Sequence, residues 1–324
     1  MKVLIIGGAG MIGRKLAERL ARDGKLGDKA ISSLTLHDVV EGAAPTGAKM
    51  PVRVVTGDLP AAGEAQKLIA DKPEVVFHLA AVVSGEAEQD FDKGYRINMD
   101  GTRSLLEAVR AAGHKPRLVF ASSVAVFGAP FHEVIEDEFF NTPLTSYGTQ
   151  KVICELMVSD YSRKGFVDGI SIRLPTVCVR PGKPNKAASG FFSNIMREPL
   201  AGHEAVLPVS DSVRHWHASP RAAVGFMLLA ATIELAKVGP RRALTMPGVS
   251  VTVAEQIAAL KKVAGDEVVA RIRREADPFI EKIVAGWPTN FSAKRARELG
   301  FKADDSFEQI VRIHVEDEFG GRIV

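Results

Sequence analysis

Residues 1–20, MKVLIIGGAGMIGRKLAERL, join an apolar run to an amphipathic run through a glycine-rich turn. The apolar run is typical of a strand buried on both faces, and the amphipathic run, which closes on Gly24, is typical of a helix. The turn spaces its glycines as G-x-x-G-x-x-G, which lets backbone N–H groups approach a pyrophosphate at the N-terminus of the helix. We therefore expect a dinucleotide to contact Gly7, Gly10, Met11, Ile12 and Gly13.

Further apolar runs follow along the chain, separated by helical patterns. The expected strands are residues 2–7, 33–38, 52–58, 74–80, 117–123 and 169–175. Strands that alternate with helices predict an α/β fold, here a Rossmann-type doubly wound parallel sheet over residues 1–175. After a stretch rich in Pro and Gly, residues 176–324 mix short strands and helices. They predict a smaller, mixed α/β substrate-binding region that is interleaved with the first domain.

Composition narrows the class of protein. The 324 residues are 46% hydrophobic, which is enough for a sizeable core, and no apolar stretch is long enough to predict a membrane span. A formal net charge of +3 without a dense basic run argues against a nucleic-acid partner. The chain opens directly on a strand-like run, and its two cysteines make no disulfide framework, so we expect a cytoplasmic protein.

A metal site is not expected. Cys154 and Cys178 lack the spacing of a zinc site. His215 and His217 stand two apart, but no acidic residue or cysteine accompanies them at ligand spacing. We interpret these histidines as part of a pocket wall.

Acidic residues follow two of the expected strands. Asp38, at the end of the second strand, can accept hydrogen bonds from both ribose hydroxyls of an adenosine and would repel a 2′-phosphate, which favours NAD over NADP. The alternative is an exposed aspartate that begins a turn. Asp58 can similarly lie at the adenine edge, and the small residues of HLAA (78–81) can run beneath the cofactor. Each of these is individually compatible with a purely structural role.

Tyr147 and Lys151 lie four apart in TSYGTQKVICEL (145–156), so they share one face of a helix. A lysine ammonium one turn away stabilises a phenolate, which equips a tyrosine to take or give a hydroxyl proton. Alone, the pair is more typical of an ordinary solvated helix face than of a catalytic site. The strand that precedes it ends in Ser122 and Ser123, and that strand end faces the same edge of the sheet as the glycine turn.

Several motifs occur in a fixed order. They are the glycine turn, Asp38, GDL (57–59), HLAA (78–81), NMDGT (98–102), SSVAVFG (122–128) and YGTQK (147–151). In this order the chain resembles the extended short-chain dehydrogenase/reductase superfamily, in its NAD-dependent epimerase/dehydratase branch. The resemblance implies that Ser123, Tyr147 and Lys151 are catalytic and that NAD is the cofactor. It also implies a homodimer and further cofactor contacts from Leu59, Leu79, Ala80, Ala81, Asn98, Ser122, Tyr147, Lys151 and Pro175.

The chain departs from many sugar-nucleotide epimerases of this branch. RLPTVCVRPG (173–182) has Thr176 where those enzymes carry an asparagine, and RHWHASPR (214–221) keeps Arg214 but lacks their acidic residues. An arginine fork matches a carboxylate, so Arg214 is a candidate anion-binding residue. The expected substrate contacts are Ser123, Tyr147, Thr176, Asn185, Lys186 and Arg214.

These departures resemble a smaller group in the superfamily, the D-erythronate dehydrogenases. The likeness rests on RLPTVCVRPGKPN, RHWHASP and GWPTNFSAKRARELGF (286–301). It implies NAD-dependent oxidation of C2 of D-erythronate to 2-oxo-tetronate, in carbohydrate-acid catabolism. Two alternatives remain open: a nucleotide-sugar epimerase or dehydratase that recycles its NAD, and a non-catalytic protein that senses a dinucleotide.

Overall fold

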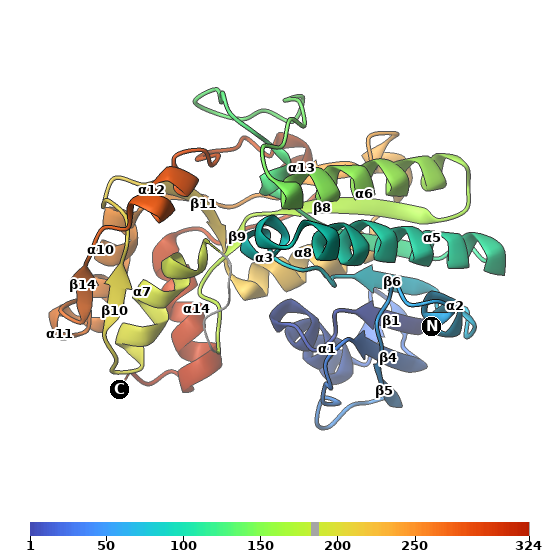
Figure 1. Ribbon diagram of the computed structural model, residues 1–324. Helices are drawn as coiled ribbons and strands as arrows, with labels where there is room; N and C mark the ends of the chain where they lie inside the picture. The colour runs from blue at the N-terminus through green and yellow to red at the C-terminus, as the bar shows by residue number, and fades with distance from the viewer. Residues whose placement is uncertain (183–187, 324) are drawn as a thin grey trace.

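A parallel sheet forms the centre of the computed structural model, which describes residues 1–182 and 188–323. Its strands are β1 (Lys2–Ile6), β4 (Ser33–Asp38), β5 (Val52–Thr56), β6 (Val75–His78), β7 (Arg117–Ser123), β8 (Asp168–Leu174) and β12 (Ala243–Thr245). The seven strands run in the order β12-β8-β7-β6-β1-β4-β5, and every neighbouring pair is parallel (Figure 1). The Rossmann-type α/β fold predicted from the sequence is confirmed.

Two layers of helices cover the sheet. Helices α1 (Met11–Asp23) and α8 (Pro220–Thr232) pack on one face, and α2 (Glu64–Ile69), α5 (Gly101–Ala112) and α6 (Ser146–Arg163) pack on the other. Side chains alternate along β1 as they do in any strand, so Val3 and Ile5 join the α1/α8 core while Leu4 and Ile6 join the opposite core. A continuous apolar run such as residues 3–6 is therefore needed to bury both faces of the strand.

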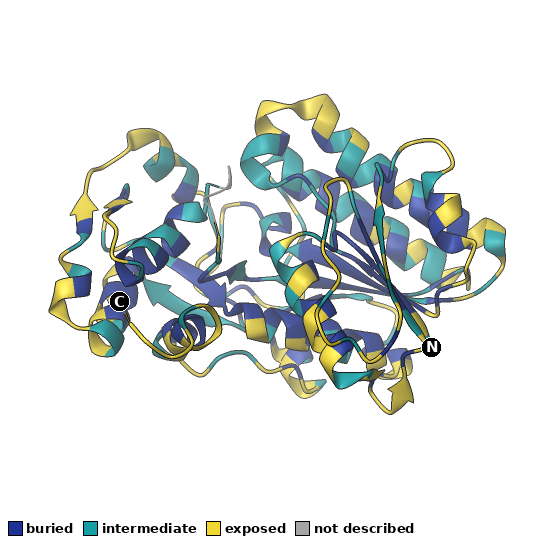
Figure 2. Cartoon of the chain, turned by 90° about the horizontal axis from the view of Figure 1, so that it is seen from below, coloured by how far each residue is buried: buried dark blue, intermediate teal, exposed yellow. Residues whose placement is uncertain are grey.

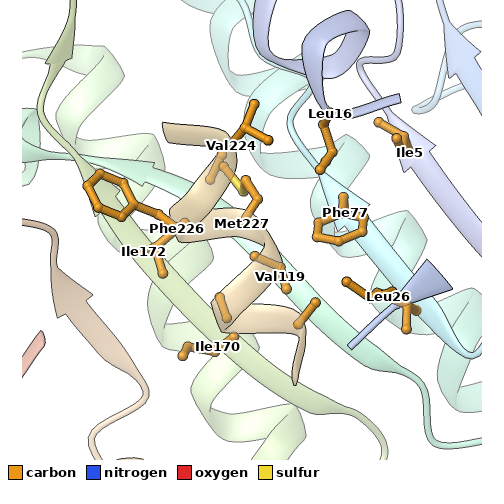
Figure 3. Packing of buried hydrophobic residues seen from close by; sticks show 14 of the residues in the cluster. Ile5, Leu16, Leu26, Phe77, Val119, Ile170, Ile172, Val224, Phe226 and Met227 are labelled. Carbon is orange, nitrogen blue, oxygen red and sulfur yellow. The ribbon is translucent and has the colours of Figure 1, made fainter. Parts of the chain in front are cut away.

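The α1/α8 core is shown in Figure 3. Phe77 from β6, Val119 from β7, Met227 from α8 and Leu16 from α1 all belong to this cluster. Figure 2 shows the same organisation from below, with dark buried strands between helices whose outer faces are exposed. The apolar stripe of each helix thus fixes which of its faces meets the sheet.

A second group of elements stands beside the sheet, on the left in Figure 1. It has a three-stranded sheet in the order β13-β11-β9, a two-stranded pair β10-β14, and a hydrophobic cluster of its own. The bounds are β9 (Thr176–Val177), α7 (Gly190–Leu200), β10 (Ala205–Leu207), β11 (Arg214–Ala218), β13 (Val249–Thr252), α10 (Val253–Ala264), α11 (Asp266–Val269), β14 (Ile272–Arg274), α12 (Pro278–Val284) and α14 (Phe307–Phe319).

The two groups are interleaved along the chain. Helix α8 and strand β12 come from the second half of the sequence, yet both belong to the central sheet and its helical cover. After the first six strands of the central sheet and before α8, the chain passes through β9, α7 and β11. This path brings residues after β8 and residues of β11 to the carboxyl edge of the sheet.

The remaining elements are short. They are β2 (Lys25–Leu26), β3 (Lys29–Ala30), α3 (Ser84–Gln89), α4 (Phe91–Gly94), the π-helical η1 (Tyr95–Asp100), the 3₁₀ turn η2 (Val124–Val126), α9 (Leu235–Val238) and α13 (Lys294–Glu298). In the parts of the chain that the structure describes, no helix is both long and apolar enough to cross a membrane.

Candidate active site

A cavity of about 390 Å³ opens at the carboxyl edge of the sheet, between the sheet and the second group of elements. Carboxyl ends of parallel strands are where ligands bind in folds of this class. Most of the predicted site residues line this cavity: Gly7, Gly10, Met11, Ile12, Gly13, Leu79, Ala81, Ser122, Ser123, Tyr147, Lys151, Pro175 and Thr176.

The glycine turn joins β1 to α1 at one end of the cavity. The N–H groups of Gly7 and Gly8 both donate to the carbonyl oxygen of His37, at 2.8 and 3.0 Å. Gly7 has a φ of 92°, and a Cβ there would lie 2.6 Å from the backbone nitrogen of Ala80, so only glycine fits. Helix α1 then begins after Gly10 without a side-chain cap. Its first N–H groups are therefore free to meet an anion.

Asp38 lies beside this turn. Its Oδ2 accepts a hydrogen bond from the N–H of Ala9 at 2.9 Å, and its Oδ1 accepts one from Val40 at 3.4 Å. The carboxylate is thus fixed at the edge of the glycine turn with acceptor capacity left over. Among the described residues Asp38 is not part of the cavity lining, so its contact with a ribose stays a prediction.

Ser123 closes β7 and faces the cavity, where its Oγ accepts a hydrogen bond from the N–H of Ala125 at 3.1 Å. The neighbouring Ser122 uses its hydroxyl differently, since it donates to Glu155 Oε1 at 2.5 Å. Ser122 is therefore bound to a buried carboxylate, and Ser123 is the serine whose donor remains available to a ligand.

Tyr147 and Lys151 both stand at the start of α6, whose first turn is capped by the Thr145 hydroxyl at 3.1 Å from the N–H of Gly148. Lys151 is 3% exposed, and its Nζ donates to the carbonyl oxygen of Ala121 in β7 at 2.8 Å. The same Nζ lies 5.5 Å from the centre of the Tyr147 ring. A fixed positive charge therefore stands beside the phenol, as the predicted proton-transfer role requires.

Glu155, one further turn along α6, binds the helix to the sheet. Its carboxylate forms a two-point ion pair with Arg173 of β8, with Oε1 to Nε at 2.9 Å and Oε2 to Nη2 at 2.7 Å. Ser122 of β7 and Asn141 also donate to it. Because both charges are buried, the paired geometry and the added hydrogen bonds offset much of their desolvation cost. The pair holds α6 in register with the two strands that carry the site.

Gly148 allows α6 to approach the serine turn. A Cβ at this position would overlap the carbonyl oxygen of Ala125 and would lie 2.9 Å from the Cβ of Pro143. The backbone of α6 therefore rests directly on the turn after Ser123. This contact sets the distance between the serine and Tyr147.

Other predicted cofactor contacts serve the structure around the cavity. Asn98 is buried, accepts from the N–H of Val82 at 2.9 Å and donates to Gln150 Oε1 at 2.7 Å, so it connects the segment after β6 to α6. Asp58 forms an ion pair with Arg96. Leu59 lies in the hydrophobic core, and Ala80 donates its N–H to the end of β1. None of these four lines the cavity in the described part of the chain.

Some of the predicted substrate contacts line the cavity, and others do not. Ser123, Tyr147 and Thr176 meet at the cavity, but Arg214 does not, because its guanidinium is engaged by Glu255 at 3.2 Å and by the carbonyl oxygen of Ser250. Asn185 and Lys186 lie outside the described residues.

Arg180 is a cavity residue that the sequence reasoning missed. It lies four positions after Thr176, its Nη2 donates to the hydroxyl of Ser189 at 3.0 Å, and its Nε donates to the carbonyl oxygen of Val177. No carboxylate lies within ion-pairing distance of it in residues 1–182 and 188–323. Burial lowers the pKa of Arg180, and the neighbouring Arg197 acts in the same direction. The cavity thus carries a cation whose charge the described chain leaves unmatched.

Further lining residues come from α7, β11 and the segment before α13. His215 of β11 lines the cavity with its ring parallel to that of Phe192 and tilted against that of Trp287, both at 5.2 Å between ring centres. The other lining residues from these segments are Ser189, Gly190, Ser193, Asn194, Arg197, Gly286 and Pro288. Arg197 is already paired with Glu198. The sequence analysis had interpreted His215 as part of a pocket wall, but it did not mark the other positions, since they approach the site only through the tertiary fold.

A search of the described residues finds no cluster of three or more His, Cys, Asp or Glu side chains arranged as metal ligands.

Comparison with known proteins places the chain. Residues 3–234 match the model of the NAD dependent epimerase/dehydratase family. The chain belongs to this family. It is 49% identical to a D-erythronate dehydrogenase of Cupriavidus necator, over 98% of both chains. It is 43% identical to a D-erythronate dehydrogenase of Haemophilus influenzae, over 98% of this chain and 99% of the other. A crystal structure of a nucleoside-diphosphate-sugar epimerase from Agrobacterium tumefaciens shares 63% identity with a TM-score of 0.97, over 99% of this chain and 95% of that one.

NAD is the cofactor of this family, and the residues present fit it. The uncapped start of α1 offers free N–H groups for a pyrophosphate, and the close packing around Gly7 leaves no room for a side chain at that position. The Asp38 carboxylate is held at the adjacent strand end by the N–H of Ala9. The cavity continues from the glycine turn to Tyr147 and Lys151, so one extended ligand can reach both.

A first prediction concerns the contact between α6 and the serine turn. Gly148→Ala should destabilise the protein by about 1–3 kcal/mol, because the new methyl overlaps backbone that has no room to move. Gly225→Ala is the matched control, since the Cβ of this helical glycine in α8 would meet nothing within 4 Å. It should be neutral or stabilise by about 0.5–1 kcal/mol. Urea unfolding of both variants measures the difference, and equal stability of Gly148→Ala and wild type would contradict the close approach.

A second prediction concerns the choice of cofactor. Asp38→Ala should reduce the preference for NAD over NADP by about tenfold or more, because it removes a charge that repels the 2′-phosphate. The ratio of the dissociation constants for the two cofactors, from titration calorimetry, measures this. Glu41→Ala removes an exposed acid three residues further along and serves as the control. If the ratio stays at the wild-type value in Asp38→Ala, Asp38 does not lie at the ribose.

Proposed function

We propose that the protein is an NAD-dependent dehydrogenase of a small sugar acid, and that it oxidises C2 of D-erythronate to 2-oxo-tetronate. The observation that carries the proposal is the position of Arg180. This unmatched cation lines the same cavity as Ser123, Tyr147 and Lys151. The two relatives named as D-erythronate dehydrogenases, which match the chain along nearly its whole length, support the same substrate.

An anionic ligand at Arg180 follows from electrostatics. A partly buried guanidinium with only neutral hydrogen-bond partners pays a desolvation cost that an anion would offset. Its planar fork binds a carboxylate through two parallel hydrogen bonds. Arg180 and Tyr147 line the same cavity, so a carboxylate on Arg180 would lie in the cavity that holds the group proposed to move the proton. A 2-hydroxy acid has this arrangement of carboxylate and hydroxyl.

In this proposal each side chain has a separate role in the reaction. Arg180 holds the carboxylate, and Ser123 hydrogen-bonds the C2 hydroxyl. Tyr147 Oη takes the hydroxyl proton, while Lys151, fixed on the carbonyl oxygen of Ala121, keeps a positive charge beside it. When bound, NAD supplies the ring that accepts the hydride from C2. Direct hydride transfer also requires that bulk water be kept out, and Trp287 forms part of the cavity wall.

A second candidate is a nucleotide-sugar epimerase that returns the hydride to its substrate. The Agrobacterium tumefaciens structure, named as a nucleoside-diphosphate-sugar epimerase, favours it. Thr176 and Arg180 weigh against it, because together they provide a compact clamp for a hydroxyl and a carboxylate. A non-catalytic dinucleotide sensor is the third candidate, and it would need none of Ser123, Tyr147 and Lys151.

The test is NADH formation followed by absorbance with D-erythronate and a panel of four- to six-carbon aldonates. We expect stoichiometric NADH with D-erythronate. Tyr147→Phe should lower kcat by about 10²–10⁴, the usual contribution of a positioned acid–base group, while NAD binding persists. Isomerisation of a nucleotide sugar without net NADH would support the epimerase, and NAD binding with no turnover of any substrate would support the sensor.

Replacing the arginines tests the carboxylate contact. Arg180→Gln should raise KM for the acid by about 10- to 100-fold, because a hydrogen bond to a charged group is worth about 1.5–3 kcal/mol. Arg214→Gln is the matched control: it removes an equal charge from β11 outside the cavity lining, and KM should change little. Steady-state kinetics of both variants give the result. A larger effect at Arg214 than at Arg180 would reverse the assignment.

We also propose a cytoplasmic homodimer. Both cysteines are free and buried, which fits a reducing compartment. On α6, Leu156 is 63% exposed and offers an apolar contact to a second copy of the chain. Light scattering that finds the mass of one chain would refute the dimer, and recovery of the protein outside the cytoplasmic fraction of cells would refute the location.

A further inference from the structure

His215 is held in one orientation at the cavity wall. Its ring is 3% exposed, lies parallel to Phe192 and contacts Trp287. Its two nitrogens have separate partners: Nδ1 lies 3.1 Å from the carbonyl oxygen of Pro288, and Nε2 lies 2.7 Å from the hydroxyl oxygen of Thr176. The ring is therefore clamped by aromatic packing and by a hydrogen bond at each end.

These partners fix which nitrogen carries the proton. A carbonyl oxygen can only accept, so Nδ1 of His215 must be the donor toward Pro288. Burial lowers the pKa of His215 to about 4, so the ring is neutral near neutral pH and carries one proton only. Nε2 is then an acceptor, and the hydroxyl of Thr176 must donate to it.

The orientation of this hydroxyl changes what Thr176 can offer a ligand. A threonine hydroxyl has one proton and two lone pairs, and here the proton is used by His215. Thr176 lines the cavity together with Ser123, Tyr147 and Arg180. The side of its oxygen that faces a ligand therefore has only lone pairs, and it accepts hydrogen bonds without donating them.

We propose that Thr176 is a specificity-determining residue that accepts a hydrogen bond from a substrate hydroxyl other than the one oxidised, and that His215 is the positioning residue that keeps Thr176 an acceptor. The inference rests on the proposed function, because it concerns the same cavity. It names the substrate class more closely: a 2-hydroxy acid with at least one further hydroxyl. A ligand with a second carboxylate, a phosphate or a carbonyl oxygen at that position would place acceptor against acceptor and would bind poorly.

The contrast with an asparagine explains why the replacement matters. A side-chain amide offers two N–H donors as well as an acceptor, so it can bind phosphate or carbonyl oxygens. Thr176 with its proton directed at His215 offers no donor. A substrate that lacks the hydroxyl therefore loses its hydrogen bond to Thr176 and binds more weakly.

Kinetics with deoxy substrates test the proposal. The hydroxyl that Thr176 recognises is the one at C3 or the one at C4. Wild type should show kcat/KM about tenfold lower with the deoxy analogue that lacks this hydroxyl than with D-erythronate, the value of one net hydrogen bond. Thr176→Val should lose about as much on D-erythronate and should no longer distinguish that analogue. Thr176→Ser, which keeps the hydroxyl, should restore the discrimination. Thr176→Val that still discriminates like wild type would overturn the assignment.

His215→Phe tests the positioning role. The phenyl ring preserves the stacking with Phe192 but releases the proton of Thr176, which can then donate to a ligand. We expect the selectivity for D-erythronate over an analogue with a carbonyl in place of the recognised hydroxyl to fall by about tenfold, with NAD affinity unchanged. A selectivity equal to wild type would contradict the role of His215.

A spectroscopic measurement separates this proposal from the proposed function. In protein labelled with ¹⁵N-histidine, nuclear magnetic resonance should show His215 protonated at Nδ1 and bare at Nε2, and Thr176→Val should shift the Nε2 signal. The opposite tautomer would overturn the inference whatever the substrate is. If this tautomer is found but no aldonate is oxidised, the proposed function fails while the hydrogen-bond arrangement stands.

Discussion

The buried ion pair between Glu155 and Arg173 is the constraint on which the geometry of the site depends. Tyr147, Lys151 and Glu155 follow one another at four-residue spacing, so all three project from one face of α6. Glu155 anchors that face to β8 through Arg173 and to β7 through Ser122. A shift of Glu155 relative to β7 and β8 would move Tyr147 relative to the serine turn.

Such a pair contributes to position more than to stability. Two buried charges replaced by apolar side chains can leave a protein equally stable, whereas removal of one partner leaves an uncompensated charge. The direction of the carboxylate–guanidinium fork, together with the hydrogen bond from Lys151 to Ala121, specifies one register of α6 on the sheet. The close approach at Gly148 adds a steric limit to the same register. Helix, strand and serine turn therefore form one rigid frame for proton transfer.

Much of this frame could be predicted from the sequence because it is local. The apolar runs at 33–38 and 117–123 became β4 and β7 with those bounds. The sequence pattern from Pro220 to about Lys237 is typical of one continuous helix, but α8 ends at Thr232. The backbone is extended at Ile233, where this side chain turns into the core and α9 begins after it. A buried apolar residue continues the helical pattern equally well, so the sequence did not indicate the break.

The substrate side of the cavity was harder to predict because it is assembled from distant segments. Arg214 looked suitable by its place in a motif, but only the fold shows that Glu255 engages it and that Arg180 lines the cavity. The tautomer of His215 likewise depends on Pro288, 73 residues further along the chain. The spacing of hydrophobic residues along the sequence indicates which side chains are buried. It does not indicate which buried cation lacks a partner.

In the proposed function, Arg180 binds the carboxylate of a hydroxy acid, and Ser123, Tyr147 and Lys151 make the cavity a site for net oxidation at its C2. The most direct test is the fate of the hydrogen on that carbon. With D-erythronate deuterated at C2, the account predicts that the deuterium is recovered in NADH, as measured by mass spectrometry, together with unlabelled 2-oxo-tetronate. Deuterium that stays in the sugar acid, or that appears in water instead of NADH, would contradict it.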